Sequence, residues 1–282
     1  EHFICLTSAL REAREDIFLN CTVGTWASPF WLQFADAIWR QDADWSTIGD
    51  QGNTRQRWIT YRDYMVYKNF TAASPLCPIN SLMTHGLMIS GFGNAGGNPP
   101  RAMEDDASAC TVAEITKEMR CAFACGSSLV ELYIDHELMT NKENGKLWRE
   151  LAECIKWHRN NADVLDDTHW VGGNPWDGSK ANIYGWASWN GEEAVLTLRN
   201  PSATEQSFTT TLRQALDIPD YITGSVILSD AFEGQTQYIG ISNSKIDIDE
   251  NITFNMPAFD VVVLNGICKS KKQHSYCKNN KK

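Results

Sequence analysis

The spacing of apolar residues changes near residue 167, and this change limits the possible folds of the chain more than any other feature. Before it, short apolar runs typical of buried strands alternate with segments whose apolar residues recur at helical spacing. Such alternation is typical of parallel βαβ units. After it, apolar residues recur at every second position, as in antiparallel strands with one buried face. We therefore predict an α/β domain at residues 1–167, an all-β antiparallel β-sandwich at residues 168–267 and a basic tail at residues 268–282.

The α/β domain is expected to contain four parallel strands with helices between them. The strands are predicted at residues 17–19, 37–39, 75–79 and 128–134, and the helices at residues 7–15, 54–70, 111–124 and 146–165. Ser28 and Pro29 predict one further short helix, because serine is a common helix cap and proline fits the first turn.

A hairpin signal marks the second domain. Asn190 and Gly191 separate two alternating apolar runs, and this dipeptide favours a tight turn in which both residues take positive φ. Strands are predicted at residues 183–189, 194–199, 207–212, 225–228, 236–239, 252–256 and 259–264. The sequence therefore predicts a domain built of antiparallel hairpins.

Composition excludes some partners. The formal net charge of -10 argues against nucleic acid, whose binding proteins normally present a basic face. No apolar run approaches the roughly 18 residues of a membrane span. The eleven tryptophans fit either a cleft that stacks aromatic rings on sugars or a large apolar core. We therefore expect neither a nucleic-acid partner nor a membrane span.

Cysteine and histidine spacing gives no sign of a cofactor. The nine cysteines and six histidines do not show the spacing of metal ligands, so we predict no metal and no organic cofactor. The chain opens with Glu1 and His2 rather than methionine, which predicts a piece of a longer polypeptide. The oligomeric state and the compartment stay open, with a secreted or periplasmic location favoured.

Polar residues follow the predicted parallel strands. In βα folds the carboxyl ends of the strands carry the functional side chains. An apolar, tryptophan-lined pocket would destabilise the charged form of a carboxylate, as a general acid requires. Asp42 is the candidate for this role, and the alternative is that it pairs with Arg40 or caps the next loop. The polar strand ends are Asn20, Cys21, Thr22, Arg40, Asp42, Asp44, Asn80, His85, Glu131 and Asp135.

Four segments together resemble a known family. The first two are residues 21–24 (Cys-Thr-Val-Gly), followed by Pro29, and residues 39–44 (Trp-Arg-Gln-Asp-Ala-Asp). Together they resemble the Cys-Ser-Gly-Gly-Gly…Trp-x-Ser-Asp-Asn-x-Asp region of retaining α-galactosidases of the melibiase type. Residues 81–86 (Ser-Leu-Met-Thr-His-Gly) resemble the family's Ser-Met-Gly-Ala-His segment, and residues 129–132 (Leu-Val-Glu-Leu) lie where it has Gly-Tyr-Glu-Leu. The resemblance, taken in order, covers nearly the whole chain.

The resemblance implies a (β/α)₈ TIM barrel followed by a β-sandwich. It implies cleavage, with retention, of terminal α-galactosides or related sugars such as α-N-acetylgalactosaminides, so the partner is an oligosaccharide or glycoconjugate substrate. Asp42 matches the general acid/base. A structural role at the strand ends stays the alternative for His85 and Glu131. The substrate-binding residues implied are Cys21, Gly24, Trp26, Trp39, Arg40, Asp44, Trp45 and His85.

A second carboxylate is expected outside this chain. Retention needs two carboxylates about 5–5.5 Å apart, and the family's nucleophile, in a Lys-x-Asp motif on an earlier strand, would precede Glu1. Only four of the eight strands of a barrel are predicted. We therefore expect the C-terminal half of the barrel, inactive as a fragment. Two alternatives stay open: a catalytically silent carbohydrate-binding protein and a transglycosidase of the same fold. Val23, Thr25 and Gln41 depart from the family and leave the sugar open.

Overall fold

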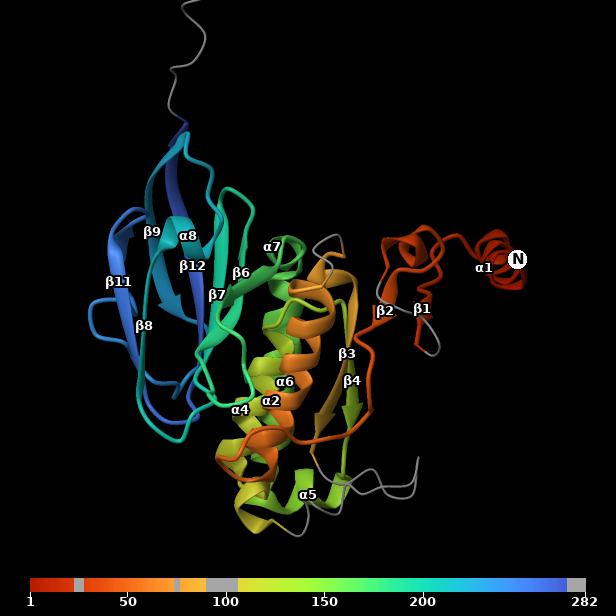
Figure 1. Cartoon of the computed structure of the whole chain (residues 1–282), viewed down its shortest axis with the longest axis horizontal. Helices are drawn as coiled ribbons and strands as arrows, with labels where there is room; N and C mark the ends of the chain where they lie inside the picture. The colour runs from red at the N-terminus through yellow and green to blue at the C-terminus, as the bar shows by residue number, and fades with distance from the viewer. Residues whose placement is uncertain (23–27, 74–76, 90–105, 273–282) are drawn as a thin grey trace, which may run out of the picture.

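The computed structural model describes residues 1–22, 28–73, 77–89 and 106–272. Figure 1 shows a parallel sheet on one side, antiparallel sheets on the other, and helices α2, α4 and α6 between them. These helices are Thr54–Val66, Val112–Phe123 and Lys146–Asn160. In the described parts of the chain no helix is long and apolar enough to cross a membrane.

The parallel sheet has four described strands in the order β1-β2-β3-β4, and it does not close into a barrel within the described residues. The strands are Asn20–Cys21, Ala37–Trp39, Leu82–Met88 and Leu129–Tyr133. The remaining helical elements of this part are α1 (His2–Ala13), η1 (Pro29–Gln33), η2 (Tyr67–Thr71), η3 (Ile79–Ser81), η4 (Ala107–Cys110), α5 (His136–Asn141), η5 (Lys142–Asn144) and α7 (Ala162–Leu165).

Several helices begin where polar side chains cap them. Ser28 accepts a hydrogen bond from the Phe30 backbone at the start of η1, as expected for Ser-Pro. Asn53 accepts from the Gln56 backbone at the start of α2, and Thr111 caps α4 in the same way. These bonds satisfy backbone N–H groups that have no partner inside the helix.

The prediction for the third strand is wrong. Residues 74–76 lie outside the described part, and Pro78 is followed by the turn η3, so the strand begins only at Leu82. A register shift between Thr84 and Leu87, with Gly86 at a φ of 84°, interrupts the regular pattern of this strand. His85 therefore lies within β3 rather than after it. The first strand also lies later than predicted, at Asn20–Cys21 rather than residues 17–19.

The antiparallel part consists of two sheets around one core. The larger has the order β10-β9-β12-β7-β6-β5, and the smaller pairs β11 with β8. The strands are β5 (His169–Gly172), β6 (Tyr184–Trp189), β7 (Glu193–Arg199), β8 (Gln206–Thr211), β9 (Ile222–Asp230), β10 (Lys245–Asp247), β11 (Asn251–Met256) and β12 (Val261–Lys272), with the short helix α8 at Leu212–Ala215. Alternate residues such as Leu196, Phe254 and Val262 fill the core from both sheets.

The hairpin between β6 and β7 is confirmed, but its turn differs from the prediction. Only Gly191 takes a positive φ, of 100°. The side chain of Asn190 instead accepts hydrogen bonds from the backbones of Glu192 and Glu193, which widens the loop. The predicted strand at residues 236–239 is wrong, because Tyr238 begins a turn that leads into β10.

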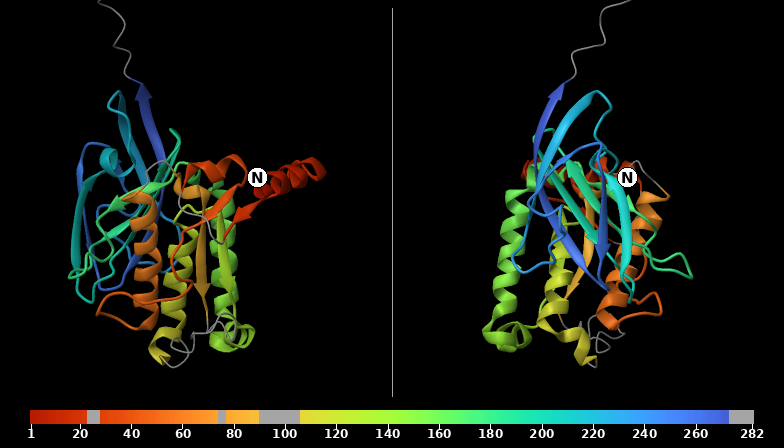
Figure 2. Two further views of the ribbon diagram at one scale, coloured as in Figure 1. Left: turned by 45° about the vertical axis from the view of Figure 1, so that its right-hand side comes forward. Right: turned by 90° about the vertical axis from the view of Figure 1, so that its left-hand side faces the viewer.

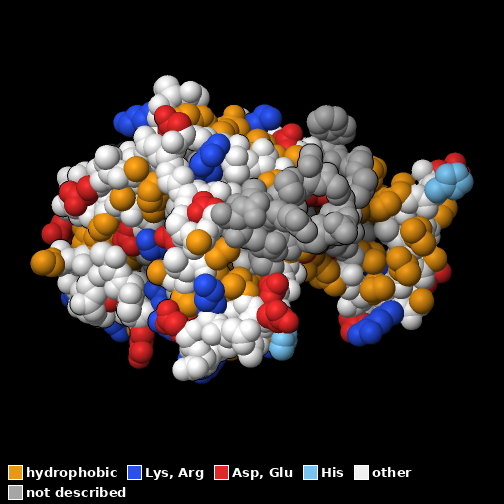
Figure 3. Space-filling model, turned by 90° about the horizontal axis from the view of Figure 1, so that it is seen from below, with side chains coloured by type: hydrophobic (Ala, Val, Ile, Leu, Met, Phe, Trp, Pro, Cys, Tyr) orange, Lys and Arg blue, Asp and Glu red, His pale blue; other side chains and the backbone are white. Residues whose placement is uncertain are grey.

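Hydrophobic side chains are exposed around both edge strands of the parallel sheet. Beside β1 these are Ile4, Leu6, Phe18 and Phe30, with exposed fractions of 39–59%. Figure 2 shows α1 projecting from this edge, and Figure 3 shows orange side chains gathered on the same lobe. At the β4 edge Leu132 is also exposed. Both edges therefore carry exposed apolar side chains, and most of them lie beside β1.

Candidate active site at the carboxyl end of the parallel sheet

The loop that follows β2 has an unusual backbone. Gln41 and Asp42 have φ values of 72° and 68°, in the left-handed region that costs a non-glycine residue roughly 1 kcal/mol or more. Arg40 is fully buried, and its guanidinium donates to the Gln41 carbonyl at 2.7 Å and the Ala43 carbonyl at 3.1 Å. Burial lowers the pKa of Arg40 to about 10. A buried side chain therefore holds the loop in this conformation.

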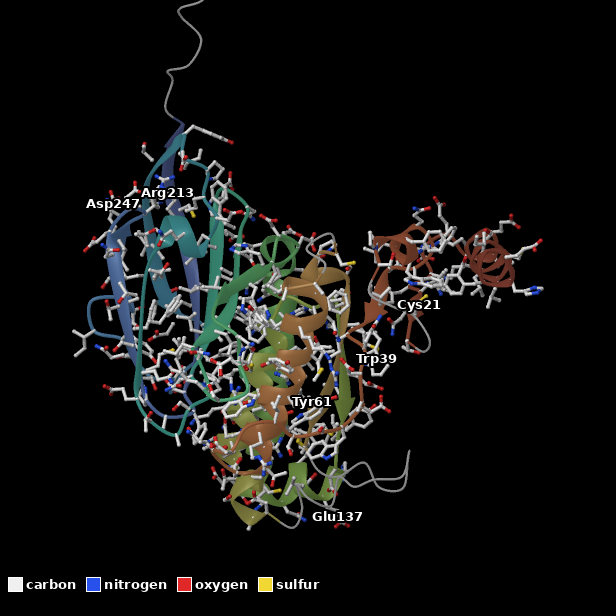
Figure 4. The ribbon with its side chains drawn as sticks, in the orientation of Figure 1. Cys21, Trp39, Tyr61, Glu137, Arg213 and Asp247 are labelled. Carbon is white, nitrogen blue, oxygen red and sulfur yellow. The ribbon has the colours of Figure 1, made fainter. Side chains whose placement is uncertain are left out.

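Tyr61 of α2 fixes the same loop from the other side. Its hydroxyl oxygen lies 3.1 Å from the Ala43 nitrogen, which donates to it, and 3.3 Å from the Ala43 carbonyl. The Arg40 guanidinium lies 5.6 Å from the centre of the Tyr61 ring and 5.9 Å from that of Trp39. Burial raises the pKa of Tyr61, so its hydroxyl stays protonated and able to donate. Figure 4 shows Trp39 and Tyr61 on the parallel-sheet side of the molecule.

Asp42 lies in polar surroundings rather than in the expected apolar pocket. Its side chain is 39% exposed, and Lys68 Nζ lies 3.7 Å from its Oδ2 atom. The amide of Asn69 donates to the same Oδ2 atom at 2.8 Å. The ion pair of Asp42 is therefore made with Lys68, whereas the guanidinium of Arg40 bonds to backbone carbonyls.

The remaining predicted residues lie at different depths. Trp39 is half-buried at the end of β2, and Asp44 is exposed. Trp45 stacks on Trp58 with ring centres 4.9 Å apart, so one face of its ring is covered. Cys21 is 7% exposed on β1, where burial raises the pKa of its thiol.

The structure therefore brings residues 39–45 together, with Cys21 on the adjacent strand. Residues 20 and 21 pair with residues 37 and 38, which places the end of β1 beside β2. His85 lies within β3 at Leu82–Met88. Gly24 and Trp26 lie outside the described residues. The roles assigned to all of these residues stay predictions.

Sequence reasoning missed the residues of α2 and η2 that touch this loop. Tyr61 and Lys68 are seven residues apart, which is two helical turns and places them on one face. Their spacing could have indicated a shared face, but not the loop that this face meets.

On β4, burial and a hydrogen bond with Glu131 raise the pKa of Tyr133.

Alternative sites in the described residues would be a cluster of metal-ligating side chains or a hollow away from this loop. In the described residues no group of His, Cys, Asp and Glu side chains could hold a metal ion. A hollow of 840 Å³ lies on the antiparallel sheet, lined by residues that include Trp189, Tyr221 and Ile267. It therefore does not coincide with the loop after β2.

The fold is one that solved glycosidases share. No protein-family model and no curated protein matches the chain. Its structure is similar to that of α-galactosidase from Saccharomyces cerevisiae with raffinose, with a TM-score of 0.54, 9% identity and coverage of 95% of this chain and 67% of that one. It is also similar to AmyP in complex with maltose, with a TM-score of 0.52, 9% identity and coverage of 97% and 62%.

The resemblance to α-galactosidases is thus confirmed at the level of the fold. The chain spans 46–67% of the length of the solved structures that it resembles. At this identity the likeness concerns the fold alone, so any activity must be argued from the site.

Proposed function

We propose that this chain is part of a retaining glycoside hydrolase that acts on terminal α-galactosides or related α-linked sugars, such as α-N-acetylgalactosaminides. One observation carries the proposal. Asp42 follows a parallel strand at the carboxyl edge of the sheet, on a left-handed backbone that the buried Arg40 and Tyr61 hold in place. The similarity to a yeast α-galactosidase solved with raffinose supports the choice of substrate class.

In the proposed mechanism Asp42 is the general acid and then the general base. It protonates the glycosidic oxygen as the bond to the sugar breaks, and later removes a proton from the water that attacks the covalent intermediate. The nucleophile is a second carboxylate about 5–5.5 Å away. Cys21, Gly24, Trp26, Trp39, Arg40, Asp44, Trp45 and His85 belong to the substrate-binding region, with Arg40 acting through the loop because it is fully buried.

The proposal includes the architecture of the whole enzyme. Residues 1–167 form part of a (β/α)₈ barrel, residues 168–267 form a β-sandwich, and residues 268–282 form a basic tail. The apolar surface at Phe18 and Leu132, at the two edges of the parallel sheet, supports pairing with further barrel strands. The nucleophile then comes from those strands, and residues 1–282 alone do not turn over an aryl α-galactoside.

Leaving-group dependence tests the role of Asp42. In the intact protein, Asp42→Ala should lower kcat on an unactivated α-galactoside such as raffinose by about 10²–10⁴-fold, because the departing sugar needs a proton. An aryl galactoside with a good leaving group does not need this proton, so its kcat/KM, which reports bond cleavage and not the later hydrolysis step, should be much less affected. Asp220→Ala is the matched control, since Asp220 is an exposed carboxylate before β9 and is outside the candidate site. Equal losses on both substrates would refute the assignment.

A further inference from the structure

One contact at the site has no part in the chemistry above. The side-chain amide of Asn69 donates two hydrogen bonds, to the Arg40 carbonyl at 3.0 Å and to Asp42 Oδ2 at 2.8 Å. These acceptors flank Gln41, the first residue of the left-handed pair. A single side chain therefore spans the strained part of the loop.

Asn69 owes its position to an irregular turn. It lies in η2, a π-helical turn that follows α2, in which the Ala72 nitrogen bonds to the Tyr67 carbonyl at 2.8 Å. Such turns insert one extra residue into a helix and occur frequently at functional sites. Phe70 in the same turn is 1% exposed, which anchors the turn in the core. The amide is thus presented to the loop from a firmly packed element.

The two bonds link Asp42 to the most immobile part of the loop. Arg40 is fully buried and bonds to the Gln41 and Ala43 carbonyls, so its own backbone cannot shift freely. Asp42 is 39% exposed and would otherwise be able to change its rotamer. Within the described residues both polar contacts of this carboxylate involve Oδ2, from Asn69 and Lys68. Oδ1 takes part in neither of these contacts.

We propose that Asn69 is a positioning residue that holds the Asp42 carboxylate in one rotamer and assigns its Oδ1 atom to proton transfer. The proposal rests on the proposed function, because it needs Asp42 to be the general acid/base. Asn69 acts through Asp42 and does not touch the substrate. Its removal should therefore slow the protonated step and leave substrate binding unchanged.

The test compares two substrates in the intact protein. Asn69→Ala should lower kcat on raffinose by about 10–100-fold with an unchanged KM. On an activated aryl galactoside it should change kcat/KM by less than about twofold, because kcat/KM reports bond cleavage and not the later hydrolysis of the covalent intermediate. Asn69→Leu has nearly the same shape but cannot donate, so it should give the same pattern, and it serves if the alanine variant does not fold. Asn251→Ala is the matched control, because Asn251 is an exposed asparagine on β11. A loss that is equal on both substrates, or no loss, would overturn the proposal.

Failure of the inference can be told apart from failure of the proposed function. If Asp42→Ala shows the leaving-group dependence and Asn69→Ala does not, the function stands and the positioning role falls. If Asp42→Ala shows no such dependence, a double-mutant cycle on unfolding still tests the contact. Asn69→Ala and Asp42→Ala should then be coupled by about fivefold in the unfolding equilibrium constant. Strictly additive effects would refute the contact itself.

Discussion

Arg199 should be among the most sensitive positions for the stability of this protein. It is fully buried on β7, and its guanidinium donates to Thr60 Oγ1 at 3.1 Å, the Tyr184 hydroxyl at 2.7 Å, and the Gln56 carbonyl and side-chain oxygens at 2.9 and 2.8 Å. Thr60 and Gln56 belong to α2. The antiparallel sheet and the helical layer are therefore joined by one buried cation.

The effect of Arg199→Met can be worked out from these partners. Methionine fills part of the volume but leaves the Gln56 side-chain oxygen without its donor, at a cost of about 1–3 kcal/mol. The buried Asp63 also loses a nearby positive charge, since the Tyr184 hydroxyl links it to Arg199. Breaking a buried charge network typically costs about 3–5 kcal/mol. Because Asp63 keeps Arg62 at 2.8 Å, we expect about 3 kcal/mol in the free energy of unfolding.

Urea unfolding, followed by tryptophan fluorescence and far-ultraviolet circular dichroism, measures this change. A loss of about 3 kcal/mol corresponds to a fall in Tm of roughly 6–12 °C for a protein of this size. The control is Arg14→Met, whose partner Asp16 is 76% exposed, and we expect no measurable change. A loss below about 1 kcal/mol for Arg199→Met would refute the idea that this network joins the two parts.

Two further predictions concern stability. Gly185→Ala should lower the free energy of unfolding by about 2–3 kcal/mol, because a Cβ atom there would overlap the Thr197 carbonyl. The control Gly178→Ala, in open space at a φ of 100°, should lower it by about 1 kcal/mol. Equal losses in the two unfolding curves would contradict this prediction. Hydrogen bonds from Ser108 and the Thr54 backbone lower the pKa of Asp106 to about 2. Asp106 therefore contributes stability above pH 4 that is lost as the pH falls toward 2, and Asp106→Asn should flatten this part of the stability profile relative to the unchanged protein.

Burial explains which elements the sequence could reveal. The helix at Lys146–Asn160 buries one face, and strands such as Glu193–Arg199 point alternate residues into the core, so their periods are visible in the chain. The strand at Leu82–Met88 was misplaced because a bulge and Gly86 interrupt its alternation. Such interruptions depend on the neighbouring strands, which a local pattern does not contain.

The helix α2 shows a second limit. Arg55, Arg62 and Asp63 are buried within it, although charged residues in a sequence normally indicate a solvated face. Their partners Glu118 and Tyr184 come from elements far along the chain. Asp42 could be proposed from its place after a strand, whereas the contacts of Tyr61 and Asn69 with its loop could not be predicted. Their contacts exist only because α2 and η2 lie beside the loop that follows β2.

The antiparallel part also supports the candidate site. The loop at residues 46–53 follows Trp45, and the antiparallel part contacts it at three points. Gly49 lies against the ring of Trp176, and Gly52 packs so closely on Phe259 that a Cβ atom would not fit. The side-chain oxygen of Gln51 accepts hydrogen bonds from Ser202 and from the Ala203 backbone, the latter at 2.8 Å. The segment that carries Asp42, Asp44 and Trp45 is thus held at one end by Arg40 and Tyr61, and at the other by residues more than a hundred positions later. Residues of the antiparallel part therefore hold the loop into which the candidate site continues, and we expect changes in these contacts to alter the position of the segment that carries Asp42.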